Sequence, residues 1–470
     1  MIPDDPIIAL ATSSGVGAIA VIRLSGKGVI PVVSKLFQSV RNKDLNKQKT
    51  HTVLLGHVLN KGRMIDEVLV TVFRAPHSYT GEDTVEISCH GSSFIQHEII
   101  RLFLENGCRM ATHGEFTMRA FLNGKMDLSR AEAVADVIAS DSAASHQVAI
   151  RQMRGGIARE LQVLRGQLLD FAALIELELD FSGEDVEFAN RAQFQELVIK
   201  IRSVLKRLTD SFAFGNAVKN GIPVAIIGAP NVGKSTLLNA LLNEEKAIVS
   251  DIAGTTRDAI EDEINIEGVR FRFTDTAGIR ETKDAVESIG IQKAYEKAEN
   301  AQLIIFLTNS EKFKVQGSRF KVQGLKFKDE IKEIKNRFPN KRLLVIANKV
   351  DLLSGEEKLR LTAEFPGILL LSAKENMGID TLKSELTSLV DMGALSNNET
   401  IVTNSRHFEA LNHALTAISS VQKSIDRNIS TDLFAIDIRE CLRHLGTITG
   451  DYDVDKDILG HIFSNFCIGK

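Results

Sequence analysis

Residues 222–235 read Ile-Pro-Val-Ala-Ile-Ile-Gly-Ala-Pro-Asn-Val-Gly-Lys-Ser, and the apolar run Thr236–Leu242 follows directly. This order of a strand, a glycine-rich turn ending in Lys and Ser, and a helix start is the context of a phosphate-binding P-loop. Backbone N–H groups of the turn and of the helix N-terminus would bind phosphate oxygens. Lys234 would reach the β- and γ-phosphates, and the Ser235 hydroxyl would bind Mg²⁺. The stretch therefore predicts an α/β domain that binds a nucleotide.

Two later segments indicate which base is bound. The strand-like run Arg342–Ala347 ends in Asn-Lys-Val-Asp351, and the run Ile368–Leu371 leads into Ser-Ala-Lys374. The Asp351 carboxylate can accept two hydrogen bonds from N1–H and the exocyclic amine of guanine. Adenine lacks that donor pair and would leave a desolvated carboxylate unpaired. Backbone groups of the Ser-Ala-Lys loop can contact the guanine carbonyl. The sequence therefore predicts GTP.

A fourth strand, Phe271–Thr274, ends in Asp-Thr-Ala-Gly278, which offers a carboxylate near Mg²⁺ and a glycine N–H for the γ-phosphate. Ligands of open α/β sheets bind at the carboxyl ends of the strands, where all four motifs lie. The GTP-binding residues predicted from these motifs are Asn231, Val232, Gly233, Lys234, Ser235, Thr236, Asp275, Thr276, Ala277, Gly278, Asn348, Lys349, Asp351, Ser372, Ala373 and Lys374.

The group that orients the attacking water is not obvious from these motifs. Many relatives of this fold place a glutamine directly after Asp-x-x-Gly, whereas this chain has Ile279. The nearby carboxylates that could replace it are those of Glu281, Asp284 and Glu287. No clear arginine finger is present in cis, although Arg257 and Arg280 lie close in sequence, so a monovalent cation could supply the missing positive charge.

Several segments together resemble the MnmE (TrmE) family of bacterial and organellar tRNA-modification GTPases. They are Asn231 in the P-loop, Ala247–Asp258 with its Gly-Thr-Thr-Arg-Asp, Ile279, and the terminal Cys-Ile-Gly-Lys470. The resemblance covers the whole chain, because Ala20–Gly26, Tyr79–Asp83, His113–Phe116 and Phe121–Leu128 are similar to the N-terminal signatures of the family.

The resemblance implies that two G domains pair face to face with K⁺ bound. The K⁺ ligands would be the side chain of Asn231 and the backbone carbonyls of Ser250, Ile252 and Thr255. Thr256 would join Ser235 on Mg²⁺, and Glu287 would orient the water through a bridging water. The loop residues Ser250, Asp251, Ile252, Ala253, Gly254, Thr255 and Thr256 join the predicted GTP site, and Glu287, Lys234 and Arg280 form the candidate catalytic set.

The family's N-terminal domain resembles folate-binding one-carbon enzymes and forms dimers. A carboxylate can pair with the amidine-like edge of a pterin, and a basic side chain can bind the glutamate tail. The positions matching a reduced-folate site, for 5,10-methylene- or 5-formyl-tetrahydrofolate, are Arg23, Glu86, Lys125 and Lys470. Cys467 is a candidate for the modification chemistry, with packing of the last helix as the alternative.

The function implied by the resemblance is K⁺-dependent GTP hydrolysis, activated by G-domain dimerisation, that drives modification of the tRNA wobble uridine. A carboxymethylaminomethyl group would be added to C5 together with the flavoprotein MnmG (GidA), which would carry the FAD, in a heterotetramer. The alternative is an RNA-binding switch GTPase of ribosome assembly, of the Era or EngA kind, which would need neither the terminal Cys-Ile-Gly-Lys nor a folate-like N-terminus.

Composition and charge limit how the protein can contact tRNA, where it is located and the state of its cysteines. The 470 residues carry 57 basic and 61 acidic side chains, a net charge of −4, so tRNA contact must use a local patch. We expect a cytoplasmic protein, because the chain shows no signal-peptide pattern and no apolar run of membrane-spanning length. The four cysteines lack metal-ligand spacing and are expected to be reduced thiols.

Sequence texture predicts α/β and α regions in four segments. We expect an α/β domain of short strands at 1–120, which the resemblance implies is folate-binding-like, and helical parts at 121–215 and 386–470 around a Ras-like GTPase domain at 216–385. We expect strands at Ala18–Leu24, Thr52–Val58, Glu67–Phe73 and Thr84–His90, and helices at Phe94–Glu105, Ser405–Ile425, Asp432–Leu445 and Asp455–Phe466. Ser129 and Glu132 have the spacing of a capping box.

Residues 312–342 contain the repeat Phe313–Gly317 and Phe320–Gly324, with eleven basic and three acidic side chains, a net charge of +8. Interleaved Phe and basic residues could bind RNA by stacking and phosphate contact. We favour the alternative of a duplicated surface insertion, disordered or helical, without a partner.

Overall fold

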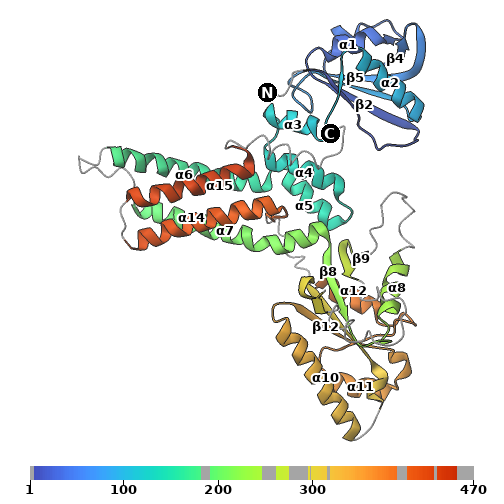
Figure 1. Cartoon of the computed structure of the whole chain (residues 1–470), viewed down its shortest axis with the longest axis vertical. Helices are drawn as coiled ribbons and strands as arrows, with labels where there is room; N and C mark the ends of the chain where they lie inside the picture. Colours follow the sequence, from blue (N-terminus) through green and yellow to red (C-terminus); the bar gives the residue numbers. More distant parts are fainter. Residues whose placement is uncertain are drawn as a thin grey trace. The chain divides into compact units, whose positions relative to one another are not determined.

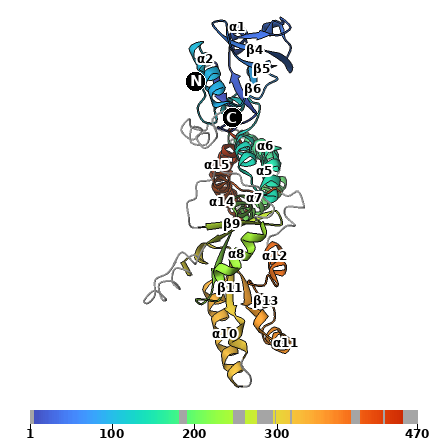
Figure 2. The same cartoon turned by 90° about the vertical axis from the view of Figure 1, so that its right-hand side faces the viewer.

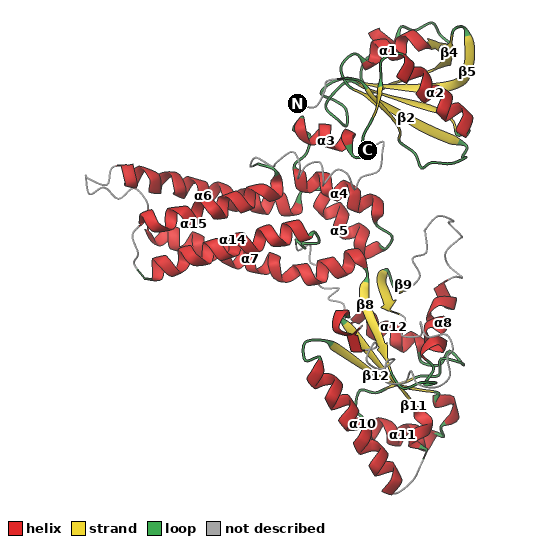
Figure 3. Ribbon diagram, viewed as in Figure 1, coloured by secondary structure: helices red, strands yellow, loops and turns green. Residues whose placement is uncertain are grey.

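The computed structural model describes residues 5–180, 191–245, 261–274, 295, 296, 298–314, 318–388, 400–427 and 431–451. These residues group into two units that interleave along the chain: one within 1–138, 151–205 and 410–470, the other within 139–150 and 206–409. Figures 1 and 2 show the helices and strands in two views, and Figure 3 separates them by type. The expected α/β and α fold class is confirmed.

The N-terminal part of the first unit is built on a seven-stranded sheet in the order β3-β4-β5-β6-β2-β1-β7. All neighbours are antiparallel except β1 and β7, which are parallel. The strands are β1 (Ile7–Leu10), β2 (Ile19–Ser25), β3 (Phe37–Ser39), β4 (Thr52–Asn60), β5 (Arg63–Phe73), β6 (Thr84–His90) and β7 (Arg109–Met110). The four strands expected from the sequence are confirmed, whereas β1, β3 and β7 were not predicted.

Two helices, α1 (Val29–Leu36) and α2 (Ser93–Glu105), share one hydrophobic core with this sheet. A 3₁₀ helix, η1 (Leu45–Lys47), also contributes to this core. Alternating burial along β5 and β6 matches a sheet with one covered face. The helix expected at Phe94–Glu105 is α2 and is confirmed.

A buried ion-pair network anchors α3 (Glu115–Leu122). The guanidinium of Arg119 is 2% exposed and lies 2.9 Å from Glu115 and 3.2 Å from Glu82. Arg109 on β7 binds the same carboxylate, with its Nη2 2.7 Å from Glu115 Oε1. Burial works against the charge of Glu115, but hydrogen bonds from Arg109, the Thr112 N–H and Arg119 outweigh it and lower its pKa to about 2.

The remaining helices of the first unit form a helical part with an apolar interior. In this part, α6 (Gly156–Asp180) packs against α15 (Thr431–Thr449). The other helices are α4 (Leu128–Ala139), α5 (Ala143–Met153), α7 (Arg191–Asn220) and α14 (Ser405–Asp426), of which α5, α7 and α14 extend into the second unit. The helices expected at Ser405–Ile425 and Asp432–Leu445 are confirmed, and the one at Asp455–Phe466 lies outside the described residues.

The predicted capping box at Ser129 and Glu132 is wrong. Asp127 is the residue that caps α4, because its Oδ1 accepts hydrogen bonds from the Arg130 N–H at 3.0 Å and from the Ser129 hydroxyl at 2.6 Å. The Ala131 N–H donates to the Asp127 carbonyl. The N-cap of α4 is therefore Asp127, two residues before the predicted cap Ser129.

The second unit contains a six-stranded sheet in the order β13-β12-β11-β8-β10-β9, parallel except for the β9–β10 hairpin. Its strands are β8 (Ile222–Ile227), β9 (Glu261–Ile266), β10 (Val269–Thr274), β11 (Leu303–Asn309), β12 (Arg342–Asn348) and β13 (Leu369–Leu370). The continuous apolar runs of β8 and β11 are buried on both faces, as parallel strands between helix layers require.

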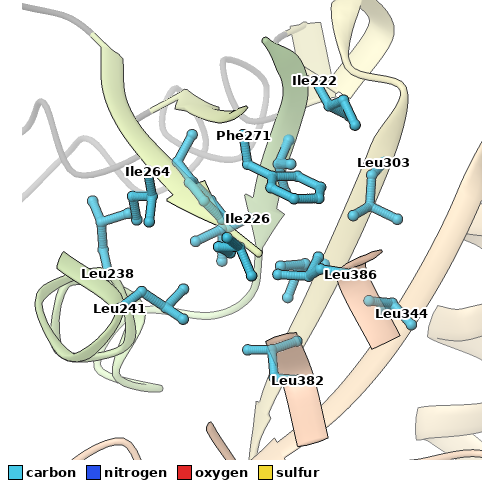
Figure 4. Packing of buried hydrophobic residues seen from close by; sticks show 14 of the residues in the cluster. Ile222, Ile226, Leu238, Leu241, Ile264, Phe271, Leu303, Leu344, Leu382 and Leu386 are labelled. Atoms are coloured by element: carbon cyan, nitrogen blue, oxygen red, sulfur yellow. The ribbon is translucent and has the colours of Figure 1, made fainter. Parts of the chain in front are cut away.

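Helices cover both faces of this sheet. One core joins the sheet to α8 (Lys234–Glu245), α12 (Ile379–Ser388) and the adjoining ends of α5 and α7, and Figure 4 shows its central side chains. The core of the other face contains α10 (Ser318–Arg337), α11 (Gly355–Glu364) and the 3₁₀ helices η2 (Ser310–Phe313) and η3 (Val350–Leu352). This is a three-layer α/β arrangement.

The β9–β10 hairpin is tied to the ends of two helices. Arg270 on β10 forms an ion pair with Asp141, lies 3.3 Å from Glu263 and donates from Nη2 to the Lys219 carbonyl at 3.0 Å. At the hairpin turn, the Ala144 N–H donates to the Gly268 carbonyl at 3.1 Å. The hairpin is therefore held by the N-terminal end of α5 and the C-terminal end of α7.

The structure confirms that part of 312–342 is helical but corrects its interpretation as a surface insertion. Residues 318–337 form α10, and Phe313 and Phe327 are 3% and 4% exposed in the core of the sheet. Their rings contact each other at 5.4 Å, and Phe327 also contacts Phe306 and Phe365. The segment therefore belongs to the GTPase fold, and these two rings are unavailable for stacking on bases.

Cys89, Cys108 and Cys441 are buried, free thiols, as expected from the sequence, and Cys467 lies outside the described residues. Burial raises the pKa of Cys89 and Cys108 to about 11 and that of Cys441 to about 12, which keeps them unreactive. Within the described residues, no helix is both long enough and apolar enough to span a bilayer.

Candidate nucleotide and folate sites

The P-loop connects β8 to α8 through a tight turn. A Cβ on Gly228 would lie 2.3 Å from the Leu307 carbonyl of β11, so only glycine fits at the point where the loop leaves the sheet. Asn231 and Gly233 have positive φ angles of 59° and 100°. The Lys234 Nζ donates to the Gly228 carbonyl at 2.7 Å, which places the ammonium over the loop that would hold the phosphates.

Asn348 connects the P-loop to both base-recognition loops. Its side chain is 2% exposed, with Nδ2 donating to the Val232 carbonyl at 2.8 Å and Oδ1 accepting from the Ala373 N–H at 3.0 Å. A Cβ on Gly233 would lie 2.3 Å from the Asn348 Nδ2, so the glycine is needed for this contact. Asn348, predicted as a GTP-binding residue, thus acts by positioning three loops.

Asp351 lies at the surface with its carboxylate oriented by the second base loop. Ser372 donates from Oγ to Asp351 Oδ1 at 2.6 Å. That hydrogen bond is the largest contribution lowering the pKa of Asp351 below its ordinary value, so the carboxylate is ionised at neutral pH. Lys349 adopts a positive φ of 64°, and the Val350 N–H donates to the Leu371 carbonyl. The two loops are therefore held together next to the place predicted for guanine.

The described part of this site suits a nucleoside triphosphate and Mg²⁺. The N-terminal end of α8 directly follows the P-loop, and Ser235 and Thr236 in its first turn are exposed. Strands β8, β12 and β13 belong to the parallel part of the sheet, so their carboxyl ends lie at the same edge.

The rest of the predicted GTP, metal and catalytic set lies outside the described residues: Ser250, Asp251, Ile252, Ala253, Gly254, Thr255, Thr256, Asp275, Thr276, Ala277, Gly278, Arg280 and Glu287. Sequence reasoning missed β11, which lies between β8 and β12 and whose Leu307 carbonyl lies against the P-loop. The apolar run Leu303–Leu307 was the signal that could have revealed it.

The N-terminal sheet brings two of the four predicted folate residues together. Arg23 and Glu86 are directly opposite in the β2–β6 register, and Arg23 Nε lies 2.8 Å from Glu86 Oε1. The Arg23 guanidinium also lies over the rings of Tyr79 and Phe116, 5.4 Å and 5.8 Å from their centroids. A carboxylate held by one arginine beside two aromatic rings suits a flat, hydrogen-bonding heterocycle such as a pterin.

Of the other two folate candidates, the structure describes only Lys125. Lys125 donates from Nζ to the Pro76 carbonyl at 2.8 Å, and Lys470 lies outside the described residues. Tyr79, which was not singled out, packs beside Arg23 and exchanges a hydrogen bond of 2.8 Å with Thr117. Burial raises the pKa of Tyr79, which therefore keeps its phenolic proton at neutral pH.

The fold of the second unit and the loops at its strand ends are those of a P-loop GTPase. Family models match almost the whole chain: "GTP-binding protein TrmE N-terminus" over residues 6–125 and "MnmE helical domain" over residues 128–467. The chain belongs to the MnmE family of tRNA-modification GTPases, and its enzymatic activity is GTP hydrolysis in tRNA modification.

Curated relatives are similar over their full length. A tRNA modification GTPase MnmE of Flavobacterium johnsoniae is 60% identical, with 100% of both chains covered. The protein of the same description from Cytophaga hutchinsonii is 51% identical over 99% of this chain and 98% of its own. Among solved structures, a variant of Aquifex aeolicus Era bound to GDP·AlF₄⁻ matches at 27% identity with a TM-score of 0.26. That match covers 42% of this chain and 66% of the Era chain, and the score is too low to bear on the fold.

Proposed function

We propose that this protein hydrolyses GTP in a K⁺-dependent cycle that is activated when the G domains of a homodimer pair. The cycle drives addition of a carboxymethylaminomethyl group to C5 of the tRNA wobble uridine. The flavoprotein MnmG (GidA) is the partner, in a heterotetramer, and it carries the FAD. We place the GTPase domain at 216–385, inserted between the helical parts 121–215 and 386–470, and the folate-binding dimerisation domain at 1–120, in a cytoplasmic protein.

The observation that carries this proposal is the junction of three loops at Asn348, together with Asn231, which directly precedes Val232 in the P-loop. Asn231 is exposed in the P-loop and adopts a positive φ of 59°, a backbone conformation that asparagine tolerates better than most residues. An amide oxygen at that position is a hard ligand of the kind that an alkali cation prefers. A cation there would place positive charge beside the phosphates, where other GTPases use an arginine finger.

The remaining roles follow from the family and, except for those of Lys234 and Ser235, concern residues outside the described ranges. Ser250, Ile252 and Thr255 would complete the K⁺ site through their carbonyls, and Thr256 would bind Mg²⁺ together with Ser235. Glu287 would orient the attacking water, while Lys234 and Arg280 would act on the phosphates. The anionic phosphates of GTP would themselves bind the two cations. The protein residues would therefore act by positioning the cations, the phosphates and the water.

The N-terminal domain would hold the one-carbon donor, a reduced folate. Glu86 is the proposed partner of the pterin edge, with Arg23 fixing its carboxylate at 2.8 Å. Lys125 and Lys470 would bind the glutamate tail, and Cys467 is the candidate group for the modification chemistry.

The GTPase half of the proposal is tested by steady-state hydrolysis in K⁺ and in Na⁺ at constant ionic strength. We expect hydrolysis to slow markedly in Na⁺. Asn231→Ala should remove the difference between the ions, while Asn239→Ala, an exposed asparagine on the adjoining helix α8, should preserve it. Glu287→Ala should lower kcat with GTP affinity unchanged. Equal rates in the two ions would refute the K⁺ role.

The tRNA half is tested by nucleoside analysis of tRNA from cells that lack the gene. Loss of the C5 modification at the wobble uridine, restored by the wild-type gene, is the expected result. An unchanged nucleoside profile would contradict it and favour a ribosome-assembly switch. Binding of 5-formyl-tetrahydrofolate to the full chain should weaken in Glu86→Gln and remain in Glu67→Gln, an exposed acid on β5.

A further inference from the structure

One flank of α10 carries lysines and no acids. Lys328, Lys332 and Lys335 are spaced i, i+4, i+7 and therefore lie on the same side of the helix; we call them the lysine flank. The three lysines extend over about 10 Å of helix axis.

The acids of α10 lie on a different flank. Asp329, Glu330 and Glu333 differ from the centre of the lysine flank by roughly a quarter to a half turn in helical phase. The third side of the helix is apolar and buried, with Phe327, Ile334 and Phe338 all below 7% exposed. Lys326 and Arg337 lie about half a turn from the lysine flank, among the acids, so the lysine flank is one exposed side of α10 without acids and not the whole of its positive charge.

Two of these lysines have no neutralising partner. Lys328 forms an ion pair with Glu364 of α11 and lies 5.5 Å from the centroid of the Phe365 ring. Lys332 and Lys335 are exposed, and within the described part of the chain neither forms an ion pair. The ion pair of Lys328 fixes the start of the flank against α11, while the next two ammonium groups remain available.

A local cationic surface on an acidic protein selects for a polyanion. The whole chain has a net charge of −4, whereas residues 312–342 carry +8, eleven basic against three acidic side chains. Phosphate contacts by Lys and Arg supply most sequence-independent affinity for nucleic acids. The rings of Phe313, Phe327 and Phe338 are all buried, so they cannot stack on the bases of a nucleic acid. The surface thus suits a phosphate backbone rather than exposed bases.

We propose that the lysine flank of α10 is a docking surface for the tRNA phosphate backbone. The inference rests on the proposed function, in which tRNA is the substrate. Docking on the GTPase domain would hold the tRNA by its backbone, leaving the modified base to the other domains. Because the contact depends on phosphate charge and not on base sequence, its affinity should be the same for every tRNA.

The test measures binding of bulk tRNA to the full-length protein over a NaCl series at constant KCl. Lys332→Gln/Lys335→Gln should weaken binding at low salt and make the slope of log K against log salt shallower by about 1.4–1.8, or roughly 0.7–0.9 per lost phosphate contact. Charge reversal with Lys332→Glu/Lys335→Glu should weaken binding further. GTP hydrolysis without tRNA should be unchanged in both, which shows that the variants are folded.

The matched control is Lys47→Gln/Lys49→Gln, which removes the same charge from exposed positions of the N-terminal domain. Equal effects in both pairs, an unchanged slope in the α10 pair, or no measurable tRNA binding by the wild type would each overturn the proposal. Loss of binding to anionic phospholipid vesicles with tRNA binding intact would assign the surface to a membrane instead. These outcomes are separate from the tRNA nucleoside analysis, which tests the proposed function.

Discussion

The buried side chain of Asn348 donates a hydrogen bond to the carbonyl of Val232, 116 residues earlier, at 2.8 Å. Val232 lies in the P-loop and Asn348 ends β12, so this contact joins the phosphate-binding and base-binding halves of the site. The same side chain accepts from the Ala373 N–H. A residue usually assigned to the base thus also determines where the P-loop lies.

Replacing Asn348 by alanine should weaken both nucleotide binding and folding. The change leaves the Val232 carbonyl and the Ala373 N–H without their buried partner, at a cost of about 1–3 kcal/mol for each unsatisfied group. We expect at least a tenfold loss of affinity for a fluorescent GDP analogue and a lower melting temperature. Asn336→Ala, an exposed asparagine on α10, should change neither quantity. Unaltered affinity in Asn348→Ala would contradict the positioning role.

Asp351→Asn should change base specificity from guanine to xanthine. The amide replaces a charged acceptor by a group that can donate to the additional carbonyl of xanthine, and it loses the paired acceptance from guanine. GTP affinity should fall at least about 100-fold, and xanthosine triphosphate should bind more tightly than to the wild type. Competition titrations with both nucleotides measure this. Asp380→Asn, an exposed acid of α12, is the control and should retain the preference for GTP.

The N-terminal domain should lose stability in acid through Glu115. Its pKa is lowered from 4.5 to about 2, so its charge stabilises the fold above pH 4.5, and this contribution is lost as the pH falls towards 2. The shift corresponds to roughly 3 kcal/mol. Pulse hydrogen exchange at neutral pH after acid incubation should show early opening of α3.

The matched variants separate Glu115 from general acid unfolding. Glu115→Gln should be less stable at pH 7 and should lack the acid-dependent step over α3. Glu105→Gln, which removes an exposed acid of α2, should leave that step in place. An identical step in the wild type and in Glu115→Gln would show that another group causes it.

The ion pair between Arg270 and Asp141 should stabilise the β9–β10 hairpin. Arg270 is 20% exposed and bonded to three groups, so a double-mutant cycle of Arg270→Met and Asp141→Ala should give a coupling energy within about 0.5–3 kcal/mol. Urea unfolding followed by hydrogen exchange of β9 and β10 supplies the free energies. The exposed pair Lys206 and Asp210 should couple by less than about 1 kcal/mol. A coupling as small for Arg270 would mean that this ion pair contributes little to holding the hairpin.

Local patterns predicted much of the fold, because they depend on neighbours in sequence. The bounds of β8 and the location of α2 follow from an apolar run and from a 3.6-residue period. The helix cap at Asp127 escaped the same reasoning, since Ser129 and Asp127 both have cap chemistry and only backbone geometry separates them. The short strands β3 and β7 carry too few residues to show alternation.

The sequence by itself determined the nucleotide chemistry and the family, because the P-loop, Asn-Lys-x-Asp and Ser-Ala-Lys motifs are contiguous and their roles follow from backbone N–H groups and carboxylates. Only the tertiary structure decided that Arg23 faces Glu86, that Asn348 joins three loops, and that the Phe313 and Phe327 rings are core while Lys332 and Lys335 face solvent. Those relationships depend on strand register and helix packing, which place residues far apart in sequence within a few ångströms of one another.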